Sequence, residues 1–210
     1  MGKRKWQTVV FILLIGLLSF AYIRLNDLFF SPEEVFWSCE RGLQSGPSEE
    51  ILLEYESADG GLILVGRQKD GLFVVPVERS HFFLWKMQKT IDGEYYCDGD
   101  VDGYYRSDGV VLGLCKNPKI TEVSFILGEW SELSWKEYTC KVEDNGLIWY
   151  DTKVQDIEKY VNYWEGRNAD GEVIYREGDA NLAESLRKGN IRPGNRTVTK
   201  PFITAPVRQE

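Results

Sequence analysis

The stretch GLILVGRQKDGLFVVPVE, residues 61–78, decides how the first half of the chain folds. Two runs rich in branched and aromatic residues flank Asp70-Gly71, and Asp-Gly between apolar runs is the strongest short-range signal for a β-hairpin. Similar runs stand on either side, at residues 51–57 and 81–88. The pattern predicts a four-stranded antiparallel meander.

A helix is expected just before these strands, in FSPEEVFWSCERG at residues 30–42. Ser31 can cap this helix, Pro32 suits its first position, and Glu34 completes a capping box with Ser31. We therefore expect one short helix packed on the meander, in a domain that spans residues 31–91.

The second half of the chain continues in strand-like runs without a helix between them. Six such runs occur, separated by turn sequences such as Asn117-Pro118, residues 144–146 and residues 168–171. Short strands with regular turns predict a β-rich domain over residues 94–178, built as a small β-sandwich or as an open barrel. The fold class predicted for the whole chain is α+β, mainly antiparallel β.

The final segment, residues 179–210, changes character again. DANLAESLRKG, from Asp179 to Gly189, predicts a helix of about two turns because Leu182 and Leu186 fall on one face. The remainder has three prolines and no apolar periodicity. We expect it to be a disordered tail.

The N-terminal sequence is typical of a membrane segment. Residues 1–5 carry three basic side chains, and the 18 residues from Trp6 to Ile23 carry no charge. At about 1.5 Å per residue, this run reaches roughly 27 Å as a helix, close to the thickness of a hydrocarbon core. We expect residues 6–23 to form a signal-anchor helix in the cell membrane.

Orientation and processing follow from the flanking residues. Because basic residues stay on the cytoplasmic side, residues 1–5 should be cytoplasmic and the body of this single-pass protein extracytoplasmic. Small residues at Ser19 and Ala21 also match a signal-peptidase site. The alternative is therefore cleavage after Ala21, which would release the protein as a secreted chain.

Charge limits the partners of the exported part. The chain carries 33 acidic and 25 basic residues, a formal net charge of −8. An acidic surface disfavours nucleic acid and anionic lipid headgroups, both of which bind to basic patches. The partners expected are the membrane, through residues 6–23, and a cell-surface protein or glycan.

The order of these features resembles a known group of proteins. A basic start, a single span, an SPEE helix at residues 31–34, strands joined by glycine turns and the NADGEVIY hairpin at residues 168–175 follow one another. In this order the chain resembles the short, membrane-anchored exported proteins of Gram-positive bacteria. The resemblance is architectural and implies a location but no catalytic residue.

The segment CDGDVDGYY, residues 97–105, resembles the first half of a calcium loop. Acidic side chains at alternate positions, a glycine at the sixth and a carbonyl at the seventh are the features of such loops. The other reading is a polar connection between strands, in which Asp and Gly serve turn chemistry. No cofactor other than calcium is expected, and its ligands would be Asp98, Asp100, Asp102, Tyr104 and Asp108.

The even number of cysteines suggests a disulfide, although the pairing is not determined by sequence. Free thiols packed as small apolar side chains are the other reading. The spacing contains no Cys-x-x-Cys, which disfavours zinc binding and thioredoxin-like chemistry. The four residues are Cys39, Cys97, Cys115 and Cys140.

Aromatic residues concentrate in the second half, where exposed rings would stack on sugars or contact a protein. Strand aromatics also serve as core or cross-strand pairs. The candidates for binding are Trp130, Trp135, Trp149, Tyr150 and Trp164.

Catalysis has little support in the sequence. His81 is the single histidine, and no nucleophile motif accompanies it. We therefore expect a membrane-tethered, non-enzymatic binding or sensing module. Two alternatives stay open: a small cell-surface glycan hydrolase that uses an acidic pair, and a calcium-stabilised structural domain.

Overall fold

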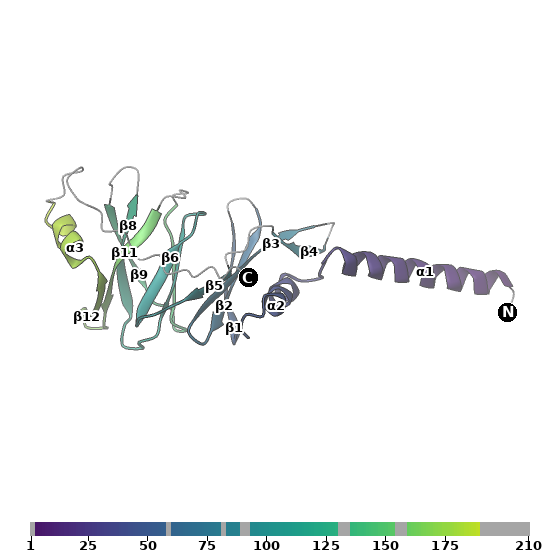
Figure 1. The fold of residues 1–210 in the computed structure, drawn as a ribbon, viewed down its shortest axis with the longest axis horizontal. Coiled ribbons are helices and arrows are strands. Elements are labelled where there is room, and N and C mark those ends of the chain that lie inside the picture. Colours follow the sequence, from purple (N-terminus) through teal and green to yellow (C-terminus); the bar gives the residue numbers. More distant parts are fainter. Residues whose placement is uncertain are drawn as a thin grey trace. The chain divides into compact units, whose positions relative to one another are not determined.

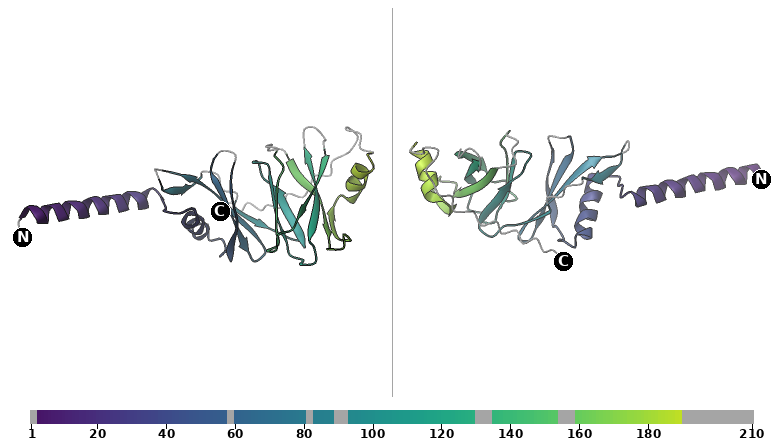
Figure 2. Two further views of the ribbon diagram at one scale, coloured as in Figure 1. Left: turned by 180° about the vertical axis from the view of Figure 1, so that it is seen from behind. Right: turned by 45° about the horizontal axis from the view of Figure 1, so that its top comes forward.

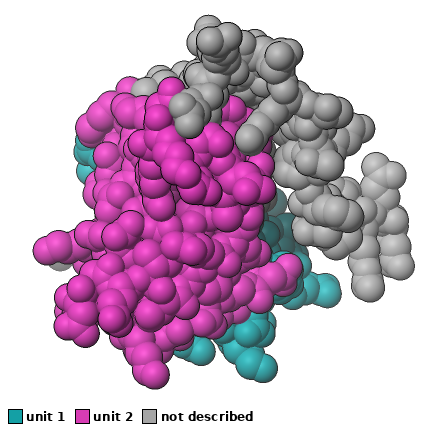
Figure 3. All heavy atoms as spheres, turned by 90° about the vertical axis from the view of Figure 1, so that its left-hand side faces the viewer, with its two compact units in different colours: residues 1–96 teal, residues 97–210 magenta. Residues whose placement is uncertain are grey.

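The fold is α+β with antiparallel strands, as predicted (Figure 1). The chain divides into two compact units, residues 1–96 and residues 97–210, which are coloured separately in Figure 3. The computed structural model describes residues 3–57, 60–80, 83–88, 93–129, 135–153 and 159–189. The expected tail at 190–210 therefore lies outside the described residues, as does His81.

Among its described residues, the first unit contains two helices and five strands. They are α1 (Lys3–Leu25), α2 (Pro32–Gly42), β1 (Glu50–Glu56), β2 (Leu62–Gln68), β3 (Gly71–Arg79), β4 (Trp85–Met87) and β5 (Gly93–Tyr96).

Helix α1 is long and apolar. Its segment Trp6–Leu25 has 20 residues and contains an 18-residue window with a mean hydropathy of 2.3, and none of that window is buried inside the protein. It is long and apolar enough to span a membrane.

Helix α2 begins where its capping residues predict. The Ser31 hydroxyl accepts a hydrogen bond from the Glu34 backbone N–H at 3.2 Å, and Pro32 is the first helical residue. Glu34 Oε2 in turn accepts from the backbone N–H of Phe30 at 3.0 Å. The first bond satisfies a free donor of the helix. The second goes to Phe30 and not to Ser31, so the Glu34 side chain fixes the segment that enters the helix and does not close the predicted capping box.

Helix α2 packs on a sheet of five strands (Figure 2). The expected meander, β1-β2-β3-β4, is present, and β5 adds to it. Because β3 is nine residues long, one of its edges pairs with β4 at residues 77–79 and with β5 at residues 71–74. The first unit therefore ends at Tyr96, beyond the expected domain end at residue 91.

Phe36 is the centre of the first core. It is fully buried, and its ring meets the ring of Phe73 edge to face, with centroids 5.5 Å apart. Gly66 in β2 lies directly against Phe36, because a Cβ at position 66 would come within 2.3 Å of Phe36 Cζ. The core residues are Val35, Phe36, Cys39, Leu64, Phe73, Val75 and Val77.

In the part of the chain that the structure describes, the second unit has seven strands and one helix. They are β6 (Val101–Tyr105), β7 (Val110–Cys115), β8 (Glu122–Glu129), β9 (Trp135–Lys141), β10 (Leu147–Asp151), β11 (Lys159–Arg167), β12 (Val173–Gly178) and α3 (Ala180–Arg187). The sequence predicted six strands and missed β6, because its alternating aspartates and glycines resemble a turn.

The strands of the second unit form two sheets, ordered β10-β7-β6 and β12-β11-β8-β9. One apolar cluster joins them, with Val111 and Ile148 from the first sheet and Phe125 and Trp164 from the second. Of the two predicted architectures, the structure is therefore the β-sandwich.

An aromatic group fills the centre of this sandwich. The ring of Phe125 lies 5.6 Å from that of Tyr138, 5.7 Å from that of Tyr150 and 5.3 Å from that of Trp164, measured between centroids. Such offset and tilted contacts stabilise a core beyond the burial of area alone.

Replacement of Phe36 by alanine should destabilise the first unit by about 3–5 kcal/mol, because it removes a fully buried ring and leaves a cavity. Amide hydrogen exchange of β2 and β3 in the full chain measures the effect. As a control, Tyr96→Ala removes a ring that is 62% exposed, and should change the stability by less than about 0.5 kcal/mol. Unchanged protection in Phe36→Ala would contradict the described core.

Candidate functional site

The predicted calcium residues lie at the start of the second unit. Asp98 and Asp100 precede β6, whereas Asp102 and Tyr104 are within it. Asp102 Oδ1 accepts from the Gly103 backbone N–H at 2.7 Å, and Oδ2 accepts from the Asp98 backbone N–H at 3.2 Å. The carboxylate of Asp102 therefore already serves the backbone of its own segment.

The other acidic candidates also have partners within the chain. Asp100 Oδ2 accepts from Asn117 Nδ2 at 2.9 Å. Asp108 forms an ion pair with Arg106 at 3.2 Å, and both side chains are largely buried. No group of three or more His, Cys, Asp or Glu side chains suited to a metal occurs among the described residues. Calcium binding remains a prediction from the sequence alone.

We expect millimolar calcium, compared with a chelator, to leave the melting temperature of the full chain unchanged, because intramolecular partners hold these carboxylates. A native site at ten times its Kd would add about 1.4 kcal/mol and raise the melting temperature by a few degrees. A rise of that size that disappears in Asp100→Ala would contradict this expectation.

All four cysteines are free thiols in the structure. Burial raises the pKa of each thiol, to about 12 for Cys97 and Cys140. Cys39 belongs to the core of the first unit, and Cys115 belongs to the core of the second unit. Cys140 packs against that second core. These thiols are protonated at neutral pH and act as small apolar side chains.

Most of the candidate binding aromatics are packed. Tyr150 and Trp164 belong to the aromatic group around Phe125. Trp135 meets Tyr160 edge to face at 5.6 Å. Trp149 is more open, with 37% of its surface exposed. Trp130 lies outside the described residues. Of the four described candidates, Trp149 is the one with an exposed side chain.

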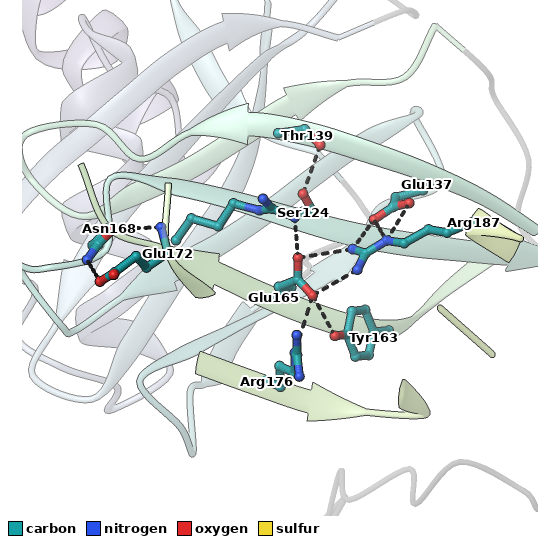
Figure 4. A network of polar contacts seen from close by, with 10 residues as sticks. Ser124, Glu137, Thr139, Tyr163, Glu165, Asn168, Glu172, Arg176 and Arg187 are labelled. Carbon is teal, nitrogen blue, oxygen red and sulfur yellow. Dashed lines mark hydrogen bonds and ion pairs between the residues drawn. The ribbon is translucent and has the colours of Figure 1, made fainter. Parts of the chain in front are cut away.

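No sequence motif pointed to the polar group that surrounds Glu165 in β11 (Figure 4). Glu165 is fully buried, with 0% of its surface exposed. Its Oε2 accepts from the Tyr163 hydroxyl at 2.9 Å and from Arg187 Nη1 at 3.0 Å. Its Oε1 accepts from Arg167 Nη2 at 2.6 Å, and Arg176 Nε lies 3.4 Å from Oε2.

Arg187 connects this group to a second carboxylate. Its Nε donates to both oxygens of Glu137 on β9, at 3.1 and 3.2 Å, while its Nη2 donates to Glu165 at 3.0 Å. We call the six residues the Glu165 cluster: Glu137, Tyr163, Glu165, Arg167, Arg176 and Arg187.

Helix α3 brings Arg187 to the sheet. The side chain of Asp179 caps α3 by accepting from the Leu182 backbone N–H at 3.0 Å. Leu182 and Ala183 are buried against Ile126 and Tyr163. Arg187 lies one turn beyond Ala183 on the same side of the helix, so it reaches Glu165 while the apolar residues pack.

The cluster fixes the protonation of its members. Burial alone would raise the pKa of Glu165, but the hydrogen bonds from Arg187, Tyr163 and Arg167 outweigh it and lower that pKa to about 2. Burial and the bond to Glu165 raise the pKa of Tyr163. At neutral pH the carboxylate is therefore ionised, and the phenol keeps its proton.

This arrangement differs from that of a glycan hydrolase. Such enzymes need one carboxyl with a raised pKa as the general acid. Glu165 is held ionised, and Arg187 lies between it and Glu137. The geometry gives the Glu165 cluster a structural role: its hydrogen bonds and ion pairs hold α3 on the outer face of the sheet.

Glu165→Gln should destabilise the second unit by about 3 kcal/mol at pH 7, because it removes the charge that three arginines share. Its folded pKa is about 2 against an ordinary 4.5, so about 3 kcal/mol of wild-type stability is present above pH 4.5 and lost towards pH 2. Thermal unfolding between pH 7 and pH 2.5 measures both effects.

Two comparisons distinguish a stabilising role of Glu165 from a loss of stability in acid that other carboxylates cause. The Glu165→Gln variant should show a flatter dependence of stability on pH than the wild type. As a control, Glu184→Gln removes an exposed carboxylate of α3 that pairs with Lys188, and should leave the melting temperature unchanged. Parallel pH profiles for all three proteins would contradict the role of Glu165.

A second group of residues lies where α1 ends. Phe29 and Trp85 form an isolated β-bridge, with both N–H···O distances at 2.8 Å, which attaches the end of the α1 segment to β4. Next to it, the rings of Phe30 and Phe83 stack at 6.2 Å although 60% and 65% of their surfaces are exposed. A long apolar helix thus leads directly into a surface that carries exposed aromatic rings.

Comparison with protein-family models, curated proteins and solved structures finds no match to this chain.

Proposed function

We propose that this protein is a membrane-tethered, extracytoplasmic, non-enzymatic module that binds or senses a cell-surface protein or glycan. The observation that carries the proposal is the apolar segment Trp6–Leu25, none of whose 18-residue window is buried by the rest of the chain. The order of features in the sequence, which resembles that of short, membrane-anchored exported proteins of Gram-positive bacteria, supports the same proposal.

The energetics favour a bilayer around α1. Full burial of a large apolar side chain is worth about 1.5–3 kcal/mol relative to exposure in water. The segment presents many such side chains, among them Phe11, Leu13 and Leu17, which are each more than 60% exposed. A hydrocarbon core would remove them all from water and satisfy the helix without a protein partner.

Charge supports one orientation. Lys3, Arg4 and Lys5 precede the span, while Arg24 is followed closely by Asp27, Glu33 and Glu34. Retention of the basic end in the cytoplasm leaves both β-rich units outside.

Binding or sensing is favoured over catalysis by the state of the chemical groups described. The thiols are buried with raised pKa values, and Glu165 is held ionised by arginines. What the body offers instead is two compact units with well-packed cores on a membrane helix. Such a scaffold presents loops and strand edges to a partner outside the cell.

Expressed in bacterial cells, the full chain should stay in the membrane fraction after a high-salt or alkaline wash. A C-terminal alkaline phosphatase fusion should be active, since that enzyme works only outside the cytoplasm. The mass of the extracted chain should include residues 1–21. Introduction of a charge in the centre of the span, as in Leu14→Arg, should reduce membrane retention because it costs about 2.5–3.5 kcal/mol there.

Leu14→Ala is the matched control, because it shortens the same side chain without a charge and should be retained. A mature chain that begins at Tyr22 would show that the segment is a cleaved signal. Recovery of the intact wild-type chain in the soluble fraction would overturn the proposed tether.

A further inference from the structure

The end of α1, the segment that follows it and one face of α2 line a hollow of about 480 Å³ within the first unit. Residues 20, 23 and 24 lie on one face of α1, and residues 34, 37 and 41 lie on one face of α2, since residues three, four and seven positions apart align on a helix. Six of its lining residues matter here: Phe20, Ile23, Arg24, Phe30, Trp37 and Arg41.

The hollow is positively charged. Arg24 and Arg41 both line it, and neither guanidinium forms an ion pair within the described residues. The one carboxylate at its wall, that of Glu34, accepts a hydrogen bond from the Phe30 backbone N–H at 3.0 Å. Arg24 packs over the Phe20 ring, 5.5 Å from its centroid, a contact that leaves its N–H donors unused. The planar donors of both guanidinium groups suit a phosphate group.

The remaining walls are apolar and aromatic. Trp37 is partly buried against the first core. Phe30 opens outwards, where its exposed ring stacks on that of Phe83 at 6.2 Å. Exposed apolar rings beside a charged site are typical of surfaces that meet a membrane interface, where aromatic side chains settle at headgroup depth.

The position along α1 sets the depth of the hollow. Phe20 and Ile23 belong to the span Trp6–Leu25, and Arg24 is one residue from its end. At about 1.5 Å per residue, 20 residues cover about 30 Å, the thickness of the hydrocarbon core. With the span in a bilayer, Arg24 and Arg41 lie near the phosphates, and Phe20 lies among the upper acyl chains.

We infer that this hollow binds one phospholipid of the surrounding membrane, with Arg24 and Arg41 on the headgroup phosphate and Phe20, Phe30 and Trp37 against the glycerol and upper acyl chains. The inference rests on the proposed tether, because the hollow meets lipid only if α1 lies in the bilayer. A membrane lipid is favoured over a free phosphate ion because part of the wall belongs to the span itself.

Native mass spectrometry of the full chain, extracted in mild detergent and mixed with phosphatidylglycerol, tests the inference. The wild type should retain one lipid molecule. Arg24→Gln and Arg41→Gln should each lower its occupancy at least about fivefold, because each removes a charge-assisted contact to the phosphate. Arg79→Gln is the control of equal charge change, since Arg79 packs over the Trp85 ring and does not line the hollow.

Inorganic phosphate in a parallel sample separates the two sources of the anion. If millimolar inorganic phosphate displaced phosphatidylglycerol from the chain, the lipid assignment would be overturned. It would also be overturned if Arg41→Gln retained as much lipid as the wild type. Fractionation of the same cells keeps this failure distinct from that of the tether. A membrane-bound chain that retains no lipid contradicts only the lipid site, whereas a soluble intact chain contradicts the tether as well.

Discussion

Antiparallel sheets must remove one apolar face from water, and this constraint organises both units. In the first unit a helix covers the sheet, through Phe36 on Phe73. In the second, another sheet does so, around the ring of Phe125. Helix-on-sheet packing and sheet-on-sheet packing each produce a close-packed core. The chain therefore forms two compact units, each with its own hydrophobic cluster.

In the second unit, the outer face of the sandwich is covered by α3 through charged as well as apolar contacts. Glu165 is removed from water, a costly step that its hydrogen bonds and ion pairs with Arg187, Arg167, Arg176 and Tyr163 offset. Directional bonds of this kind fix the position of α3 more narrowly than Leu182 and Ala183 alone would. The cluster therefore orders a short helix that has a helical hydrogen-bond pattern over only eight residues.

The junction after α1 links location to function. Only a few residues separate Leu25 from the bridge between Phe29 and Trp85, so the proposed tether would hold the first unit close to the membrane surface. A short connection also limits how far the body can move from the bilayer. Partners would then be met near the membrane, and lipids become part of the environment in which the first unit works.

The sequence by itself determined the features that depend on near neighbours in the chain. These are the apolar run of α1, the cap at Ser31, the Asp70-Gly71 hairpin and the strand-rich second half, each set by local propensity or periodicity. Tertiary structure decided the rest, since pairing across the chain is needed to place β5 on β3 and Arg187 on Glu165. Alternate polar residues in β11 fix only a shared face, and their partners come from elements that folding brings together.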